Sequence, residues 1–528
     1  MSSTYSKIAH PLFFSLIAGL LAATGFAPLD AWPVTLCALA GLFALLERAA
    51  AKKRAFAIGW WFGMGYFTLG NNWIAHAFTF QDAMPHWLGY LAVVALALYL
   101  AIYPGLATLC AWWLWTRLRG DRRGAGRVAA LTLPLAFAGS WIVSEYLRAT
   151  VFTGFAWNPL GVIWVPTDVV LLSRVIGTYG LSGVAILTGA ALAWAVQARS
   201  LPALAAFAGK LLLIFAGSYL LRVLHPHPAD TRVAIRVVQP NIGQQDKHNP
   251  AYELTNYRKL AGLSIDRQDR PRLIFWPEAA IPAFLDMEPD WRSRLAALLG
   301  PHDLLMTGGT KVYFDQKPKG IFVEQTLVGA NNSLWVLTPD ARLVGRYDKS
   351  HLVPYGEYLP MRPILSRIGL SRLVPGDADF WPGPGARTLT LPAASGRPTL
   401  NMGVQICYEI IFSGQVVDRA HRPDFLFNPS NDAWFGAWGP PQHLAQARLR
   451  AIEEGLPVIR STPTGISAVV NANGGVEASL PHYKAGAIDA FLPMAHAPTF
   501  FALFGNVVPL ALAGLFFLLA IASARVRR

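Results

Sequence analysis

Long apolar runs dominate this sequence and limit the folds that it can adopt. They fill most of residues 11–224 and return at 500–523, whereas residues 225–499 have the mixed composition of a globular domain. A transmembrane helix needs about 20 apolar residues. We therefore predict about eight membrane spans, at residues 11–27, 33–50, 56–79, 87–116, 127–147, 165–197, 203–222 and 501–523. The chain then divides into a transmembrane domain of seven spans (1–224), a globular domain (225–499) and a C-terminal transmembrane helix with a basic tail (500–528).

The positive charge of the chain is concentrated beside the apolar runs. The formal net charge is +14, yet residues 225–498 contain 27 Lys and Arg against 25 Asp and Glu. The connections 48–54 and 117–127 are basic, but 28–32 and 80–86 contain no Lys or Arg. Because cytoplasmic connections carry the excess of Lys and Arg, this pattern puts both termini in the cytoplasm. In a bacterium, the globular domain would then lie in the periplasm, anchored in the inner membrane.

A net positive charge can also indicate a nucleic-acid-binding protein, and this sequence does not favour that class. The globular part is almost neutral, and no stacking module or basic-aromatic stripe occurs in it. We therefore expect a membrane as partner and no nucleic acid.

Among the ionisable residues in or near the apolar runs are Glu145, Arg148 and Arg174. Ionisable groups at membrane depth are candidates for function. The connection 148–164 is long and rich in tryptophan, however, so a position at the level of the lipid headgroups is an equal alternative.

The chain has only three cysteines. Cys37 and Cys110 lie in apolar runs, where we expect small buried side chains, and Cys407 lies in the globular part. No CxxC pair and no His/Cys metal spacing occurs, so the sequence predicts neither a disulfide framework nor a metal site, and we expect no cofactor.

From residue 231 the pattern changes to short apolar runs bounded by Gly, Pro, Asn and Asp. Such runs are typical of strands buried on both faces. We predict strands at 232–239, 273–276, 304–307, 334–337, 400–406 and 425–428. Helices are expected at 251–267, 291–299 and 441–454, the last closed by Gly455. The alternation of helices and strands indicates a layered α/β domain.

Three chemically active side chains come at or just after strands of this domain. Glu278 follows strand 273–276, Cys407 closes strand 400–406, and Lys349 lies just past a further strand. In open α/β sheets, chemistry gathers where strands end. A thiol, a carboxylate and an ammonium together make an acyl-transfer site, since the thiol needs an activating base or cation. The plainer alternatives are an inert buried thiol for Cys407 and surface ion pairs for the other two.

The motifs around these residues resemble a known superfamily. Trp276-Pro277-Glu278, then Asp348-Lys349-Ser350-His351, then Cys407-Tyr408-Glu409 resemble the Glu-Lys-Cys triad of the nitrilase (carbon–nitrogen hydrolase) superfamily. With spans on both sides of the domain, the whole chain resembles the membrane-bound apolipoprotein N-acyltransferase family of bacteria. The resemblance implies an αββα sandwich in which Cys407 is the nucleophile, Glu278 the base and Lys349 the cation that stabilises the oxyanion.

The resemblance also implies a reaction and its partners. A phospholipid, typically phosphatidylethanolamine, would give its sn-1 acyl group to Cys407 as a thioester. The α-amine of the diacylglyceryl-modified N-terminal cysteine of an apolipoprotein would then take the acyl group, in a ping-pong reaction. Because both substrates are lipid-embedded, the site would lie at the outer membrane boundary. A monomer is the default expectation for the oligomeric state.

Four further residues are expected to support the triad. Glu357 and Glu409 would orient Lys349 or share the proton of Glu278, with a structural role as the alternative. Asn332 would hydrogen-bond in the site or start a strand, and Tyr408 would orient the acyl chain or pack. The aromatic loops 361–381 and 432–438 are candidate lids over the acyl chain.

Two other functions fit parts of the pattern. A membrane-tethered amidase of the nitrilase type would pass the acyl group to water through the same acyl-enzyme, although a soluble amide would not need so many spans. A transporter or scaffold would need paired polar groups inside the spans, and few such groups occur.

Overall fold

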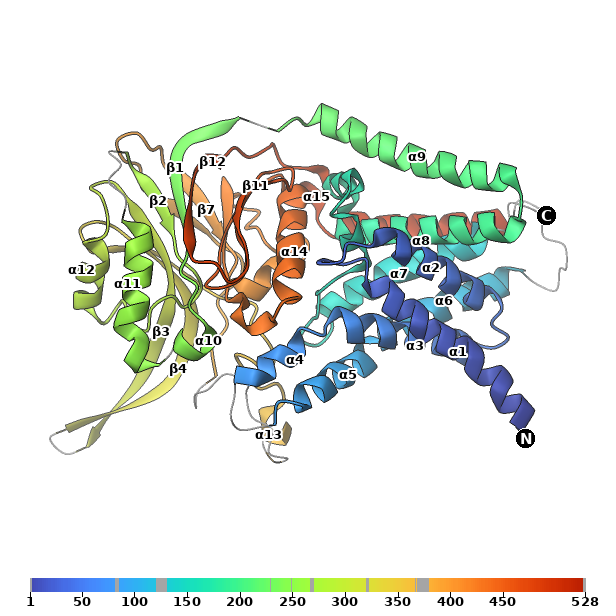
Figure 1. The fold of residues 1–528 in the computed structure, drawn as a ribbon, viewed down its shortest axis with the longest axis horizontal. Coiled ribbons are helices and arrows are strands. Elements are labelled where there is room, and N and C mark those ends of the chain that lie inside the picture. Colours follow the sequence, from blue (N-terminus) through green and yellow to red (C-terminus); the bar gives the residue numbers. More distant parts are fainter. Residues whose placement is uncertain are drawn as a thin grey trace. The chain divides into compact units, whose positions relative to one another are not determined.

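The computed structural model describes residues 2–80, 85–119, 131–227, 229–247, 249–265, 270–319, 322–365, 367 and 379–525. The chain forms two compact units (Figure 1). The helical unit comprises Met1–Ala75, Trp87–Pro226 and Pro498–Arg528, and the sandwich unit comprises His76–His86 and His227–Ala497. The segment His76–His86, which contains the end of the predicted span 56–79 and the connection after it, therefore groups with the sandwich unit.

The helical unit is built from long helices that run side by side (Figure 1). They are α1 (Ser2–Ala23), α2 (Trp32–Glu47), α3 (Lys52–Gly70), α5 (Leu88–Leu100), α6 (Ile102–Arg119), α7 (Thr132–Thr150), α8 (Ser173–Ala198), α9 (Leu201–Leu224) and α16 (Val507–Arg525). The helices α4 (Ile74–Ala77) and α15 (Phe500–Phe504) are short.

Four segments of the described chain are long and apolar enough to cross a membrane. They are Leu88–Leu118, Asp168–Ala198, Leu201–Leu224 and Val507–Arg525, and the helices His10–Ala23 and Trp32–Glu47 are apolar but shorter. Part of the predicted span 127–147 lies outside the described residues. The unit is thus a polytopic helical domain, and the number of eight spans stays a prediction.

Glycines bring the helix backbones of this unit into direct contact. A Cβ atom on Gly19 of α1 would lie 2.0 Å from the carbonyl oxygen of Phe62 in α3. A Cβ atom on Gly59 of α3 would lie 2.3 Å from the carbonyl oxygen of Pro104 in α6. Small residues are the usual means of close helix packing in membranes, where lipid tails leave no hydrophobic driving force between helices.

Glu145, Arg148 and Arg174 are all buried inside the helical unit. Glu145 accepts hydrogen bonds from Trp141 Nε1 at 3.0 Å and from the main-chain N–H of Leu160 at 2.7 Å. Arg148 donates from Nη1 to the carbonyl oxygens of Phe155 and Trp157 at 2.8 and 2.9 Å. These bonds tie the connection after α7 to the helix, which gives both residues a structural role.

The two cysteines of the helical unit correct one expectation. Cys37 and Cys110 are exposed on the surface of the unit rather than buried. An apolar side chain on a membrane helix can face lipid, so an apolar sequence context does not by itself predict burial within the protein.

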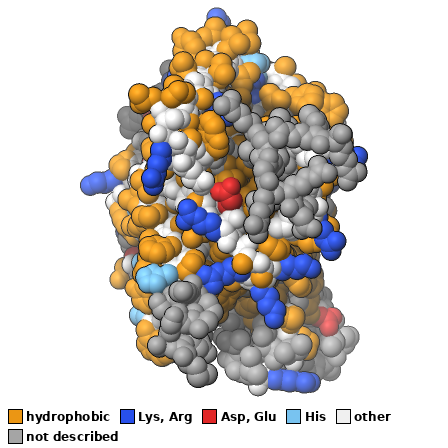
Figure 2. All heavy atoms as spheres, turned by 90° about the vertical axis from the view of Figure 1, so that its right-hand side faces the viewer, with side chains coloured by type: hydrophobic (Ala, Val, Ile, Leu, Met, Phe, Trp, Pro, Cys, Tyr) orange, Lys and Arg blue, Asp and Glu red, His pale blue; other side chains and the backbone are white. Residues whose placement is uncertain are grey.

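Figure 2 views one end of the helical unit, the end where α1 begins and α16 ends in Figure 1. Lys and Arg side chains gather on this face among apolar ones, and acidic side chains are sparse. Basic side chains of the described residues therefore gather at this end of the unit.

The sandwich unit contains two six-stranded sheets. The first has the order β12-β1-β2-β3-β4-β5 and the second β11-β10-β9-β8-β7-β6. The strands are β1 (Asp230–Gln239), β2 (Arg272–Phe275), β3 (Leu304–Lys319), β4 (Phe322–Leu337), β5 (Leu343–Asp348), β6 (Thr388–Leu391), β7 (Leu400–Val404), β8 (Phe425–Pro429), β9 (Val458–Ser461), β10 (Ser467–Val470), β11 (Val476–Leu480) and β12 (Gly486–Pro493). The helices are α10 (Gln244–Lys247), α11 (Glu253–Ser264), α12 (Pro289–Ala296), α13 (Arg362–Leu365) and α14 (Gly439–Glu454).

The layers of this unit follow the predicted αββα order. The sheets meet through aromatic side chains, with the Phe275 ring 4.7 Å from that of Phe427. Helices α11 and α12 cover the first sheet, where Leu260 and Leu295 share a core with Ile274, and α14 packs against β9 of the second (Figure 1). All six predicted strands are present. The sequence did not predict the long hairpin of β3 and β4, because polar residues and glycines interrupt its apolar runs.

Candidate active site

The strand order places each of the three predicted catalytic residues just after the carboxyl end of a strand. Strands β1, β2 and β3 are parallel, and β5 runs with them because it is two antiparallel steps from β3. Glu278 and Lys349 therefore follow strands that end at the same edge of the first sheet. In the second sheet β7 and β8 are parallel, and Cys407 and Asn431 follow them. This is the place where α/β sheets collect chemistry.

Lys349 lies between two carboxylates. Its Nζ atom is 3.0 Å from Glu357 Oε1 and 3.5 Å from Glu278 Oε1, and the side chain is 1% exposed. Asn332 Nδ2 donates to both of those oxygens, at 2.9 Å to Glu357 and 2.7 Å to Glu278. We call Glu278, Asn332, Lys349 and Glu357 the reacting cluster. It contains two of the three predicted catalytic residues and two of the four predicted supporting residues.

The carboxylates in this cluster keep Lys349 protonated. Burial lowers the pKa of Lys349, but the carboxylates of Glu357 and Glu278 outweigh burial, so the pKa lies above its ordinary value. The side chain is therefore an ammonium at neutral pH and can donate hydrogen bonds to a developing negative charge.

Cys407 begins a 3₁₀ turn, Cys407–Ile411, in a left-handed backbone conformation with φ of 51°. This conformation is unfavourable for a residue with a side chain and is found where surrounding contacts hold it. Its carbonyl oxygen accepts from His443 Nε2 at 3.1 Å and from Asn428 Nδ2 at 3.4 Å. The turn thereby presents a buried thiol at a fixed place beyond β7.

The surroundings of Cys407 keep its thiol protonated at rest. Burial and the nearby Glu278 carboxylate raise the pKa of the Cys407 thiol well above its ordinary value, against the opposing effects of Lys349 and of the Asn431 main-chain N–H. A protonated thiol needs a base to react. Glu278 Oε2 is buried and has no hydrogen-bond partner among the described residues, so it is an open acceptor in the same site.

The Glu409 carboxylate accepts hydrogen bonds from main-chain N–H groups rather than from the Lys349 ammonium. Its Oε1 atom accepts from the hydroxyl of Tyr347 at 2.9 Å and from the main-chain N–H groups of Ser350 and His351 at 2.7 and 3.1 Å. Its Oε2 atom accepts from the N–H of Ile406 at 2.7 Å. Glu409 thus fastens the segment after Lys349 to the turn of Cys407. Burial raises the pKa of this carboxyl, although its hydrogen bonds act in the opposite direction.

The other expected contributors lie at the edges of the site. Tyr408 is buried and packs edge-on against Phe412, with ring centroids 5.2 Å apart. In the predicted lid 361–381, residues 366 and 368–378 lie outside the described residues. The N–H of Phe380 donates to the Glu357 carbonyl oxygen at 3.1 Å, and Trp381 stacks on Tyr313. In the loop 432–438, Trp434 contacts Phe80, with ring centroids 5.5 Å apart.

A second group of charges, which the sequence did not reveal, lies behind the nucleophile. His443 Nδ1 is 2.9 Å from Asp432 Oδ1, and Asp432 Oδ2 accepts from Arg460 Nη2 at 2.6 Å. All three side chains are buried. We call them the holding cluster, because His443 bonds the Cys407 carbonyl directly. Burial raises the pKa of Asp432, but Arg460 and His443 outweigh burial and lower it to about 2.

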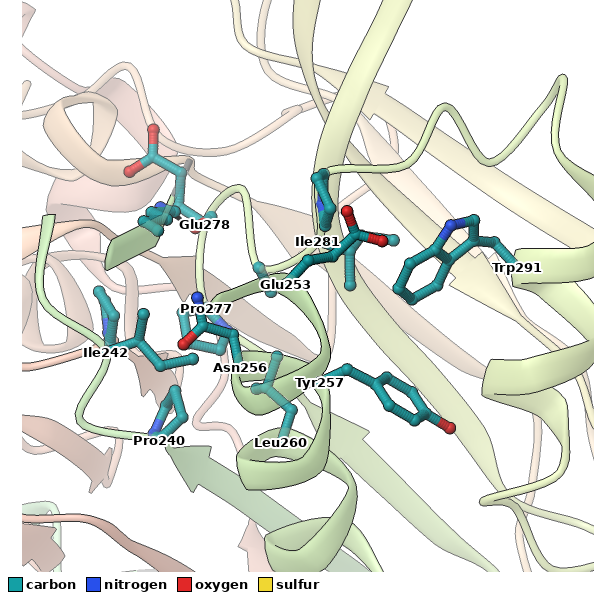
Figure 3. Close-up of a pocket in the computed structure, with 14 residues that line it drawn as sticks. Pro240, Ile242, Glu253, Asn256, Tyr257, Leu260, Pro277, Glu278, Ile281 and Trp291 are labelled. Atoms are coloured by element: carbon teal, nitrogen blue, oxygen red, sulfur yellow. Dashed lines mark hydrogen bonds between the residues drawn. The ribbon is translucent and has the colours of Figure 1, made fainter. Parts of the chain in front are cut away.

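The structure also adds a second lysine to the site. Lys247, the last residue of α10, donates from Nζ to the main-chain oxygen of Glu278 at 2.8 Å. It lines a small pocket between α11 and the loop after β2, where Figure 3 shows Asn256 and Pro277 close together. No motif marks this residue, so sequence reasoning could not have found it.

The described residues contain no group of three or more His, Cys, Asp or Glu side chains placed to hold a metal ion. The site is therefore described through its own side chains.

Two family models match the chain. Residues 18–191 match the apolipoprotein N-acyltransferase N-terminal domain, and residues 234–497 match the carbon-nitrogen hydrolase family. Among solved structures, a nitrilase-superfamily member from Saccharomyces cerevisiae, Nit3, is 19% identical and covers 52% of this chain and 94% of its own, with a TM-score of 0.33. Since this TM-score is below 0.5, the family assignment rests on the sequence relatives.

The sequence relatives cover nearly the whole chain. The apolipoprotein N-acyltransferase of Rhodopseudomonas palustris is 34% identical over 97% of this chain and 95% of its own length. The proteins of that name from Bradyrhizobium diazoefficiens and Brucella melitensis are 35% and 32% identical, over 96% and 94% of this chain and 94% and 90% of their own lengths. With a carbon–nitrogen hydrolase domain joined to a helical membrane domain, the chain belongs to the apolipoprotein N-acyltransferase family.

Proposed function

We propose that this protein transfers a fatty acyl group from a membrane phospholipid to the α-amine of the diacylglyceryl-modified N-terminal cysteine of apolipoproteins. The names of its relatives support the acceptor. The apolar helical segments support a lipid donor such as phosphatidylethanolamine. One observation carries the chemistry: a buried, unpartnered carboxylate oxygen, Glu278 Oε2, lies beside an ammonium held by two carboxylates.

In the first half-reaction, Cys407 attacks the sn-1 ester of the phospholipid. Glu278 takes the thiol proton, and a bond forms between Sγ and the ester carbonyl carbon. Lys349 donates to the oxyanion of the tetrahedral intermediate, a type of interaction whose loss typically costs about 2.7–4 kcal/mol of transition-state stabilisation. The carbon–oxygen bond then breaks, and the lysophospholipid alkoxide takes the proton from Glu278.

In the second half-reaction, the neutral amine of the acceptor attacks the thioester. Glu278 takes a proton from the attacking nitrogen, and Lys349 again donates to the oxyanion. The carbon–sulfur bond breaks, the Cys407 sulfur recovers the proton from Glu278, and an amide is released. Burial of Cys407 supports this order, because a thioester shielded from water survives until the amine arrives.

The topology of the protein forms part of the proposal. We infer that residues 225–499 lie in the periplasm, that both termini lie in the cytoplasm, and that a monomer in the inner membrane is the working form. The charge of the connections supports this orientation. Fusing alkaline phosphatase, which is active only in the periplasm, after His227 and after Arg525 tests it. We expect activity from the first fusion only, and activity from the second would contradict the orientation.

The decisive test follows the acyl group. Full-length protein in detergent micelles is incubated with phosphatidylethanolamine, and the Cys407 peptide is weighed by mass spectrometry. We expect a gain of one fatty acyl group, which disappears when a diacylglyceryl lipopeptide with a free N-terminus is added, as the N-acylated lipopeptide forms. Cys407→Ser should abolish both products, and Cys37→Ser and Cys110→Ser are matched controls that should change neither.

Two outcomes would overturn the proposal. A thioester that decays equally fast without the lipopeptide would favour the amidase alternative, in which water is the acceptor. Full N-acylation by Cys407→Ser or by Glu278→Gln would exclude the acyl-enzyme altogether and favour a non-enzymatic role.

A further inference from the structure

Lys247 connects two loops that carry parts of the reaction. Its Nζ atom donates to the main-chain oxygen of Glu278 at 2.8 Å, in the loop after β2 of the first sheet. The same atom lies 3.2 Å from the side-chain amide of Asn431, whose oxygen faces Lys247 in the orientation that satisfies its neighbours. Asn431 follows β8 of the second sheet, and its main-chain N–H donates to the Cys407 thiol. One ammonium thus bridges the segment of the base and the segment that contacts the nucleophile.

The environment of Lys247 differs from that of an ordinary surface lysine. The side chain is half-buried, and it forms no ion pair with a carboxylate among the residues that the structure describes. Burial lowers its pKa to about 8, against the raising effects of Glu278 and Cys407. An ammonium held mainly by neutral oxygens is costly to bury, and such groups gather at functional sites.

A count of charges shows what Lys247 adds. Around the thiol, Glu278 and Glu357 each bring one negative charge and Lys349 brings one positive charge, which leaves −1. Transfer of the thiol proton to Glu278 leaves that sum unchanged but moves negative charge onto sulfur and then onto the oxyanion. A second ammonium brings the sum over these four groups to zero, which lowers the free energy of the anionic states along the reaction. Asp432 does not disturb this balance, because Arg460 pairs with it.

We propose that Lys247 is a further positioning residue of this active site, which supplies a second positive charge to the reaction at Cys407 and holds the loops of Glu278 and Asn431 together. The inference rests on the proposed acyl transfer at Cys407. A purely structural role would need only the two hydrogen bonds. The variants below separate the charge from the bonds.

The first measurement is the rate at which iodoacetamide alkylates Cys407, followed on its own peptide by mass spectrometry as a function of pH. The groups that face the thiol are Glu278, Lys349 and Asp432, and those around Lys247 are Glu278 and Cys407, with Glu253 in the same pocket and Asp246 on its own turn. Lys247→Met should slow alkylation by roughly tenfold at pH 7, where Lys247 is still charged, because a positive charge near the thiolate has been lost. Lys247→Arg should keep the wild-type profile.

The second measurement separates kcat from KM for acyl transfer to the lipopeptide. Lys247→Met should lower kcat by roughly tenfold or more with little change in KM, because the charge acts on the anionic states rather than on substrate binding. Lys247→Gln keeps hydrogen-bond donors without the charge and should resemble Lys247→Met. Lys247→Arg should retain most of the activity, and Lys259→Met, an exposed lysine on α11, is the matched control.

The results of these measurements distinguish a charge effect of Lys247 from a structural role. A wild-type rate and pH profile in Lys247→Gln would show that the charge is not needed and would overturn the inference. Lys247→Arg and Lys247→Met could instead lose kcat equally, with a lower Tm and an unchanged alkylation profile. Lys247 would then have only a structural role, which would also overturn the inference. If the wild-type protein alkylates normally but transfers no acyl group, the proposed function fails, whereas the alkylation profiles still test the charge of Lys247.

Discussion

Two buried clusters of charge meet at Cys407, and they differ in how their carboxylates are used. In the reacting cluster, Glu278 shares one oxygen with Asn332 and Lys349, and its other oxygen has no partner among the described residues. In the holding cluster, both oxygens of Asp432 are engaged, one by His443 and one by Arg460. A buried acceptor without a partner is costly to keep. From this difference we expect Glu278 to receive a proton in the proposed reaction and Asp432 to hold structure.

The electrostatics of the two clusters lead to the same distinction. Asp432 has its pKa lowered to about 2, so it stays charged at neutral pH and is too weak a base to take a thiol proton. Its partner His443 instead hydrogen-bonds the Cys407 carbonyl and thereby supports the left-handed backbone of the nucleophile. Removing a member of the reacting cluster should therefore lower the rate of acyl transfer. Removing a member of the holding cluster should first lower the stability of the folded protein.

The largest effect is expected from Glu278→Gln. The amide keeps the size of the side chain but cannot accept the thiol proton, and general-base catalysis is typically worth about 10²–10⁴ in rate. We expect kcat for lipopeptide acylation to fall by that factor with nearly unchanged Tm, measured on the same detergent preparation. A loss of Tm as large as the loss of rate would remove the distinction between the clusters.

Asp432→Asn should show the opposite balance. Breaking a buried ion pair by removing one partner typically destabilises a protein by about 3–5 kcal/mol, since Arg460 would keep an uncompensated charge. We expect a clearly lower apparent Tm by differential scanning fluorimetry, and a smaller fall in the kcat of the protein that remains folded than for Glu278→Gln. Asp340→Asn, an exposed carboxylate beside Arg342, is the matched control and should leave the Tm nearly unchanged. A wild-type Tm for Asp432→Asn would contradict the holding role.

The smallest expected effect is a dependence of stability on acid pH. The pKa of Asp432 in the folded protein, about 2, lies below its ordinary value of 3.8. A carboxylate with a lowered pKa contributes stability that is fully present above its unfolded pKa and is lost as pH falls through the folded value. We expect this contribution, roughly 2 kcal/mol, to disappear between about pH 4 and pH 2. The difference in Tm between wild type and Asp432→Asn should shrink over that window, and a constant difference would exclude this titration as its source.

The sequence predicted the fold better than the site. The strands around residues 273–276, 400–406 and 425–428 were predicted because each is a continuous apolar run that ends in polar residues, a local signal that survives in any α/β context. Gly455 was recognised as the cap of α14, and it has the left-handed φ of 66° that such a cap requires. The strand β5 was expected because Lys349 follows it, whereas β6 and β9–β12 carried weaker local signals and were not predicted.

Within the site, the order of the motifs along the chain predicted which residues take part but not which residues they hydrogen-bond. The motifs named Glu278, Lys349 and Cys407. For Glu409 they left open a role beside Lys349 or Glu278 and a structural role, and its bonds to the main chain of Ser350 and His351 favour the structural one. Glu409 lies two positions after Cys407 in the sequence, so its proximity to the thiol could be predicted. Its contacts with a segment about sixty residues earlier depend on how two sheets pack, and no periodicity records that packing.

The amino-acid sequence alone determined which residues could do chemistry here and that a globular domain is joined to apolar helices, because hydrophobic period and strand-end position are local properties of a chain. Only the tertiary structure decided that Lys247 would meet the carbonyl of Glu278 and that His443 would meet the carbonyl of Cys407. Those contacts join segments that are remote in sequence. The first forms because β1 and β2 are neighbours in one sheet, and the second because α14 packs against the turn that begins at Cys407.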